Sequence, residues 1–169
     1  MTSKTIELSL DEIFNLAKAS LLKHGANEEN ADAVANTVTN AERDGSLSHG
    51  LFRIPGYIKA LQSKKVDGSA KPEIKEVTPT IFRCDAKNGF APLAHKYSLK
   101  PLIEAAHKFG IAGVAIQRSH HFAALWPEVE TISENGLVGL TSVSYTPAVA
   151  PAGGTTALFG TNPMSFAWP

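Results

Sequence analysis

A serine, a histidine and an arginine lie close together in the segment SLSHGLFRIPGY, residues 46–57. Histidine can give or take a proton near neutral pH, because its ordinary pKa is about 6.5. Ser48 can orient the His49 imidazole or pass a proton. Arg53 shares a helix face with His49 if the segment is helical there, and its planar guanidinium suits a substrate carboxylate. A loop histidine bonded to backbone and a solvated surface arginine remain the alternative.

A second polar pair, His120 and His121, stands between an apolar run and a segment that we expect to be helical. This junction is where α/β sheets place ligands. Adjacent histidines can bind a metal ion, but no carboxylate or cysteine stands nearby at ligand spacing, so we expect no metal site. The backbone N–H groups of residues 122–125 can instead bind a phosphate or ribose at the start of the helix.

A third candidate is the glycine-rich segment GGTTALFGTNP, residues 153–163. Its glycine pair can bring backbone close to a ligand, and Thr161 and Asn162 add polar side chains. The segment is neither a G-x-G-x-x-G fingerprint nor a P-loop with its lysine. Ordinary turn chemistry remains the alternative, because Asn-Pro favours turns.

The first of these segments follows two predicted helices. Ser9 and Glu12 form an S-x-x-E capping box that opens a helix ending near Gly25. Asn27 opens a second helix with a narrow face of small residues (Ala31, Val34, Ala35, Val38 and Ala41). Small residues allow close helix packing, so we expect an antiparallel helical hairpin that leads directly into residues 46–57.

The rest of the chain alternates predicted strands and helices. We expect strands within residues 74–86 with a turn at Thr78-Pro79, a helix over 91–109 that contains Pro101, buried strands within 111–117 and 137–145, a helix within 120–136 that has Pro127 near its start and is ended by Gly136, and a strand from Met164. The fold class is therefore α/β, with a helical part at 1–60 and an α/β part at 61–169.

Composition narrows the class of protein. Sixteen Lys and Arg residues balance sixteen Asp and Glu residues, which does not favour nucleic acid or a membrane surface as a partner. A single cysteine, Cys84, suits a reducing compartment, so we expect a cytoplasmic protein. The chain ends in the apolar segment SFAWP, from which we expect a truncated, N-terminal part of a longer protein. The alternative is a short strand that ends in the sheet.

Three segments together resemble one family. RDGSLSHGLFRIPGY, RSHHFAALWPEVE and LFGTNPMSFAWP have the order and separations found in the malate/L-lactate dehydrogenase type-2 family of NAD(P)H-dependent oxidoreductases, which have a non-Rossmann fold. Within that family the sequence HHFAALWPEVE is most similar to the Δ1-piperideine-2-carboxylate and Δ1-pyrroline-2-carboxylate reductases.

The resemblance implies a role for each matching residue. His49 would be the proton donor and Ser48 the serine of its relay, while Arg53 and Thr161 would bind substrate. The nicotinamide cofactor, NADPH or NADH, would be lined by His121, Phe122, Ala123, Ala124 and Leu125. A hydride would reach the C=N carbon of a cyclic imine, giving L-pipecolate or L-proline.

Members of this family have a second half, which carries the relay aspartate and most cofactor-phosphate ligands. Without an orienting carboxylate an imidazole loses control of its tautomer. We therefore expect the chain to be inactive alone and to act with a complementary C-terminal half, or as a homodimer. Two alternatives remain: a 2-keto acid reductase of the malate/L-lactate type, and a non-catalytic remnant kept for assembly.

Overall fold

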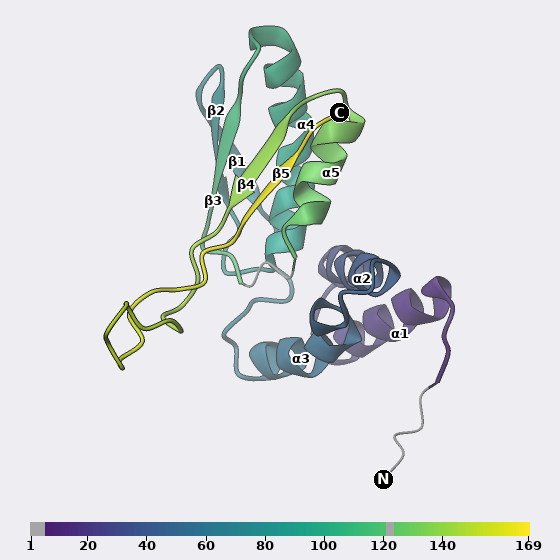
Figure 1. The fold of residues 1–169 in the computed structure, drawn as a ribbon. Coiled ribbons are helices and arrows are strands. Elements are labelled where there is room, and N and C mark those ends of the chain that lie inside the picture. The colour runs from purple at the N-terminus through teal and green to yellow at the C-terminus, as the bar shows by residue number, and fades with distance from the viewer. Residues whose placement is uncertain (1–5, 121–123) are drawn as a thin grey trace.

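The computed structural model describes residues 6–120 and 124–169 (Figure 1). In chain order the elements are α1 (Leu10–Lys23), α2 (Glu28–Arg43), the short 3₁₀ helices η1 (Leu47–His49) and η2 (Leu51–Arg53), α3 (Ile54–Gln62), β1 (Glu73–Thr78), β2 (Ile81–Asp85), α4 (Ala91–Phe109), β3 (Gly113–Gln117), α5 (Trp126–Glu134), β4 (Gly139–Ser142) and β5 (Met164–Ala167). Helices α1–α3 gather at one end of the molecule, and α4 and α5 lie along one side of the strands. The predicted α/β class is confirmed.

The helical end begins with the predicted caps. The Ser9 side chain accepts a hydrogen bond from the Glu12 backbone N–H at 3.2 Å, and the Glu12 carboxylate accepts one from the Ser9 N–H at 2.8 Å. Asn27 caps α2 by accepting from the Asn30 N–H at 3.0 Å. Each cap satisfies an N–H group that the first helical turn cannot.

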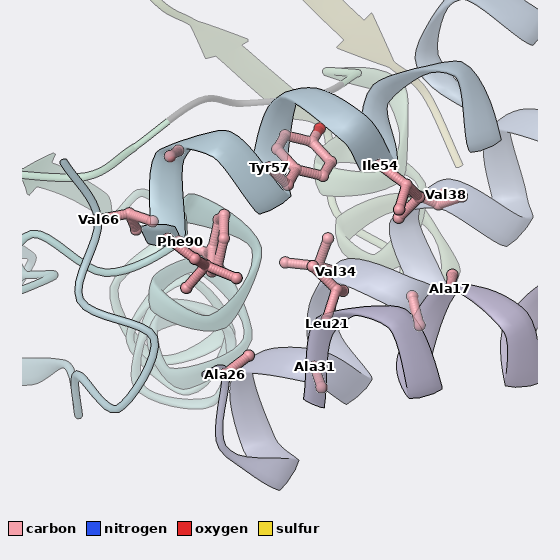
Figure 2. Packing of buried hydrophobic residues seen from close by; sticks show 13 residues of the cluster. Ala17, Leu21, Ala26, Ala31, Val34, Val38, Ile54, Tyr57, Val66 and Phe90 are labelled. Carbon is pink, nitrogen blue, oxygen red and sulfur yellow. The ribbon is translucent and has the colours of Figure 1, made fainter. Parts of the chain in front are cut away.

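A core of small and aliphatic side chains joins these helices (Figure 2). Leu21 of α1 packs with Val34 and Val38 of α2, and all three are at most 2% exposed. Tyr57 of α3 and Phe90, just before α4, extend the same cluster, with their rings 5.7 Å apart. The predicted hairpin is thus a closed core, and it contacts the part of the chain beyond residue 60 through Phe90. The division at residue 60 stays a prediction.

The described strands form two sheets. β1 pairs antiparallel with β2, β2 pairs parallel with β3, and β4 pairs antiparallel with β5. No ladder of hydrogen bonds joins β3 to β4 among these strands. Helix α4 continues through Pro101 and ends at Gly110, whose φ of 84° suits a residue without a Cβ.

The prediction of buried strands within 111–117 and 137–145 is wrong for this chain. β3 and β4 are shorter than those segments, and their residues are half-buried or exposed except for the buried Gly139. Leu140 is 64% exposed and Ile111, just before β3, is 76% exposed. The physical reason is that each strand has a hydrogen-bonded neighbour on one side only. None of the described helices is both long and apolar enough to span a bilayer.

Candidate functional site

The candidate site lies on the turn between α2 and α3. The backbone leaves α2 at Arg43, reverses at Gly45, whose φ is 73°, and passes through η1 and η2 into α3. Gly50 joins the two 3₁₀ helices and packs against Glu42: a Cβ at Gly50 would lie 2.0 Å from Glu42 Oε1. The same oxygen accepts a hydrogen bond from the Leu51 N–H at 2.7 Å. A Cβ at position 50 would therefore have to displace the Glu42 carboxylate.

Two serine hydroxyls approach one nitrogen of His49. Nδ1 lies 3.0 Å from Ser48 Oγ and 3.2 Å from Ser46 Oγ. A neutral imidazole has one protonated and one unprotonated nitrogen, and the hydrogen-bond partner of one decides the state of the other. If a hydroxyl donates to Nδ1, the proton of the ring is on Nε2. That tautomer leaves Nε2 as a donor for a ligand.

The surroundings of His49 favour the neutral ring. Partial burial lowers its pKa below the ordinary value of 6.5, and the positive charge of Arg53 lowers it further. The charged ring is disfavoured both by loss of water and by a like charge. Both effects favour the neutral imidazole over the charged one.

Arg53 is fixed beside this histidine. Its Nε donates to the carbonyl oxygen of Ser48 at 2.7 Å, so the guanidinium is tied to the turn that carries the imidazole. No carboxylate pairs with Arg53 within residues 6–120 and 124–169. An arginine without an acidic partner next to a neutral histidine is suited to bind a small carboxylate.

Trp126, the first residue of α5, reaches this turn from a distant part of the sequence. Its ring lies edge-on to His49, with centroids 6.3 Å apart and planes at 77°. The indole Nε1 donates to Asp44 Oδ2 at 2.8 Å. Asp44 is also bonded by the Nε of Arg43 at 2.7 Å, and these two bonds, that of Arg43 first, lower the pKa of the Asp44 carboxyl. The tryptophan is thus held in place against the imidazole.

Sequence reasoning missed several of these residues. Ser46 was inside the segment of interest, three residues before His49, and its spacing was a usable signal. No local sequence pattern predicts the hydrogen bond from the Leu51 N–H to Glu42 or the one from Trp126 to Asp44. Trp126 did stand in a distinctive sequence, ALWPEVE, which marked the region without giving the role.

The predicted cofactor segment is described in part. His121, Phe122 and Ala123 lie outside the described residues. Ala124 and Leu125 are buried at the start of α5, where no side chain caps the helix. The adjacent His120 is tied by its backbone, donating to the Gly89 carbonyl at 2.8 Å and accepting from the Ala91 N–H at 3.1 Å. The predicted contact of this segment with a cofactor stays a prediction.

A cavity of about 1110 Å³ opens at His120 and runs between β3 and β4, with α4 and α5 along its side. At its His120 end the lining includes Arg118, Ser119 and His120. Its described lining has one arginine or lysine, Arg118, and that side chain is already bonded to Asp85. The described lining therefore offers no unpaired arginine or lysine for the phosphates of a nicotinamide cofactor.

Thr161 is placed on the long connection between β4 and β5. Its side chain is exposed, and no hydrogen bond to Ser48, His49 or Arg53 is recorded among the described residues. The neighbouring Asn162 shapes the connection by accepting from the Tyr145 N–H at 2.9 Å. The substrate contact of Thr161 stays a prediction. No group of three or more His, Cys, Asp or Glu side chains capable of holding a metal ion occurs in the described part of the chain.

Comparison with known proteins gives one consistent result. Residues 8–169 match the model of the family described as malate/L-lactate dehydrogenase. The chain is 44% identical over 164 residues to a Δ1-pyrroline-2-carboxylate reductase of Ancylobacter novellus, covering 97% of this chain and 48% of that protein.

Solved structures agree with the sequence comparison. The Δ1-piperideine-2-carboxylate reductase of Pseudomonas syringae pv. tomato superposes with a TM-score of 0.91 at 45% identity, covering 96% of this chain and 49% of that one. A malate dehydrogenase of Pyrococcus horikoshii superposes with a TM-score of 0.90 at 29% identity, covering 97% and 47%. The chain spans about half the length of the relatives that it matches. Because the family model covers almost all of it, this chain belongs to the malate/L-lactate dehydrogenase family.

Proposed function

We propose that this chain is the substrate-binding half of an NAD(P)H-dependent reductase that acts on a cyclic imino acid, Δ1-pyrroline-2-carboxylate or Δ1-piperideine-2-carboxylate. The observation that carries the proposal is that one turn holds both His49 and Arg53. The Nδ1 atom of His49 faces two serine hydroxyls, and the guanidinium of Arg53 is bonded to the same turn. The substrate class is supported by the names of relatives that are 44% and 45% identical to the chain.

Each residue on the turn has a task in this reaction. Arg53 binds the carboxylate of the imino acid and so fixes which face of the ring is presented. His49 gives the proton of Nε2 to the imine nitrogen. As Nε2 loses its proton, Nδ1 takes one from the Ser48 hydroxyl, and this exposed hydroxyl takes one from solvent in turn, so that the imidazole stays neutral and the serine is restored.

The nicotinamide cofactor, when bound, supplies the hydride that the imine carbon receives. Ala124 and Leu125, together with the predicted His121, Phe122 and Ala123, would lie against its ring, and Thr161 would contact the substrate. We propose NADPH as this cofactor. NADH is the alternative, because it carries the same nicotinamide ring.

We propose further that turnover needs a second polypeptide segment, corresponding to the other half of the relatives, and that the complete enzyme is a homodimer. The chain spans about half of those proteins. In its described part, the cavity at His120 offers no unpaired arginine or lysine for cofactor phosphates. Alone, the chain is expected to be inactive.

A 2-keto acid is the second candidate substrate. The malate dehydrogenase of P. horikoshii has the same fold at a TM-score of 0.90, and His49 and Arg53 would serve a keto acid equally well, with the proton going to oxygen. The residues that contact the far end of the substrate would decide between the two.

The test is an assay of the chain mixed with the second half of the P. syringae reductase. Reduction of Δ1-piperideine-2-carboxylate should exceed that of pyruvate, with NADPH and NADH compared in parallel. His49→Gln should lower kcat by about 10²–10⁴, and Arg53→Lys should mainly raise KM because the bidentate fork is lost. His24→Gln, at the half-buried residue that follows α1, is the matched control and should leave the rate unchanged.

Two results would contradict the proposal. One is substantial turnover by the isolated chain. The other is a His49→Gln variant as active as His24→Gln. Faster reduction of pyruvate than of the imino acid would favour the second candidate substrate.

A further inference from the structure

The cavity between the two sheets has the edges of two strands as its walls. It is lined by residues from β3, including Val114 and Ile116, and by all of β4. β3 is paired with β2 alone and β4 with β5 alone, among the described strands. Each strand therefore presents a row of backbone N–H and C=O groups toward the cavity, and unpaired groups of this kind are a template for another strand.

Several large apolar side chains at this cavity are exposed to solvent. Ile111, Val138 and Leu140 all line it, and they are 76%, 50% and 64% exposed. The strand sequences around them, IAGVAIQ and LVGLTS, are of the continuous apolar kind that sheets bury on both faces. The chain thus carries strands suited to the middle of a sheet and leaves them at an edge.

A buried acid faces the same space. Glu128 of α5 is 5% exposed and lines the cavity, and its Oε2 atom has no hydrogen-bond partner among the described residues. A buried carboxyl oxygen without a donor is costly, so its partner is expected from outside this part of the chain. This observation is independent of the strand edges and points to the same occupant.

We propose that the cavity is the seat of a β-strand that belongs to the half of the relatives not matched by this chain. The inserted strand pairs with β3 on one side and β4 on the other, so that the two sheets become one. It also brings a hydrogen-bond donor, a basic side chain, to Glu128. The length of the relatives supports this occupant, because half of each one has no counterpart here.

A second copy of this chain is a poorer occupant. Each described strand of the chain already has a neighbour and is held in its own sheet, so a copy has no separate strand to insert between two edges. The inference deepens the proposed function by giving the binding place of the second polypeptide, and it rests on the need for one. Its test measures the protection of backbone amides and the affinity between the two halves, and does not depend on turnover. A chain that binds the second half without catalysis can therefore be distinguished from a chain that does not take up the strand.

The test is hydrogen exchange on the chain with and without the second half of the P. syringae reductase. In the isolated chain, amides of residues 113–117 and 139–142 that face the cavity should exchange fast. Addition of the second half should protect amides in both strands, while the outer strand β1 serves as the internal control. A complex that leaves 113–117 and 139–142 unprotected would overturn the proposal. Failure of the chain to associate with the second half would also overturn the proposal. So would protection of these amides in the chain alone when it self-associates.

Two substitutions give a second measurement by titration of the same pair. Leu140→Lys places a charge in the cavity and should weaken association at least about tenfold. Val77→Lys, on the outer strand and 51% exposed, is its matched control and should have no effect. Glu128→Gln removes the negative charge and should weaken association about tenfold. Equal affinities for Leu140→Lys and Val77→Lys would contradict the strand, and an unchanged affinity for Glu128→Gln would contradict the basic donor.

Discussion

The helical end and the paired strands β4–β5 bury their apolar residues to very different extents. In the helical end, Leu21 and Val38 are completely buried. In the two-stranded sheet, Leu140 and Phe166 stand opposite each other in the ladder and are 64% and 57% exposed. The two regions use equally apolar residues, so the difference comes from what covers them.

Each helix of the helical end has a partner within the chain. α1 packs on α2, α3 closes the cluster, and Phe90 fills its far side (Figure 2). The β4–β5 pair contacts α5 and is open elsewhere. The turn that carries His49 therefore packs on a closed hydrophobic core. The cavity beside His120 instead lies between two described sheets whose facing strands, β3 and β4, each have a hydrogen-bonded neighbour on one side only. Under the proposed function, His49 and Arg53 would thus be held in place by the chain's own core.

Truncation of one leucine in each region should show the largest contrast. Leu21→Ala should lower the free energy of unfolding of the chain by about 3 kcal/mol, because a buried leucine leaves a cavity. Leu140→Ala should change it by less than about 0.5 kcal/mol, since little apolar surface is buried there. Urea denaturation followed by circular dichroism measures both. Similar losses for the two variants would contradict the comparison.

Two ionisable groups at the cavity should make the open region sensitive to pH. Burial raises the pKa of Glu128 from 4.5 to about 7 and lowers that of His95 from 6.5 to about 4. Between pH 4.5 and 6.5 the folded state therefore holds an extra proton on Glu128 and lacks one on His95. The extra proton on Glu128 makes the free energy of unfolding fall with rising pH, and the missing proton on His95 makes it rise. Each slope is about 1.4 kcal/mol per pH unit.

In the unaltered chain these two slopes should cancel over that range. Glu128→Gln leaves the slope of His95, so stability should rise from about pH 4 to 6.5. His95→Gln leaves the slope of Glu128, so stability should fall from about pH 4.5 to 7. Urea unfolding at half-unit steps of pH measures both slopes, with His24→Gln as the control. Two variants with the same slope would show that the groups do not titrate separately.

Local signals in the sequence predicted the closed region well and the open region poorly. The capping box at Ser9 and the cap at Asn27 are confirmed because both act within three residues. The apolar runs 111–117 and 137–145 were correctly read as strands and wrongly read as buried. Burial of a strand depends on neighbours that are distant in the sequence, and among the described strands β3 and β4 each have a hydrogen-bonded neighbour on one side only.

The candidate site divides in the same way. Ser48, His49 and Arg53 could be singled out together because six consecutive residues contain them, and the structure joins them by hydrogen bonds. Trp126 could not, because it lies 82 residues from Asp44, its bonding partner. Such a contact depends on how α5 packs against the end of α2, which no local pattern contains.

A methyl group at Gly50 should disturb the closed region at the site itself. In Gly50→Ala the Cβ would displace the Glu42 carboxylate from the Leu51 N–H, at a cost of about 1.5 kcal/mol in stability. Gly56→Ala in α3 is the matched control, because its Cβ meets nothing within 4 Å, and it should be neutral or slightly stabilising. Thermal unfolding and the NMR shifts of the His49 ring measure both. Equal behaviour of the two variants would show that Gly50 is not constrained by space.

The smallest effect is expected where the two regions meet, at Trp126. Trp126→Phe keeps an aromatic edge beside His49 and removes the N–H bonded to Asp44, so stability should change by less than about 0.5 kcal/mol. The ring of His49 becomes more accessible to water, and because burial is the main cause of its lowered pKa, that pKa should move up toward 6.5. Titration of the His49 C2 proton by NMR measures the shift. Trp168→Phe, at an exposed tryptophan beyond β5, should leave it unchanged. An unaltered pKa in Trp126→Phe would mean that the imidazole of His49 is shielded by its own turn alone, and that α5 contributes nothing to its protonation.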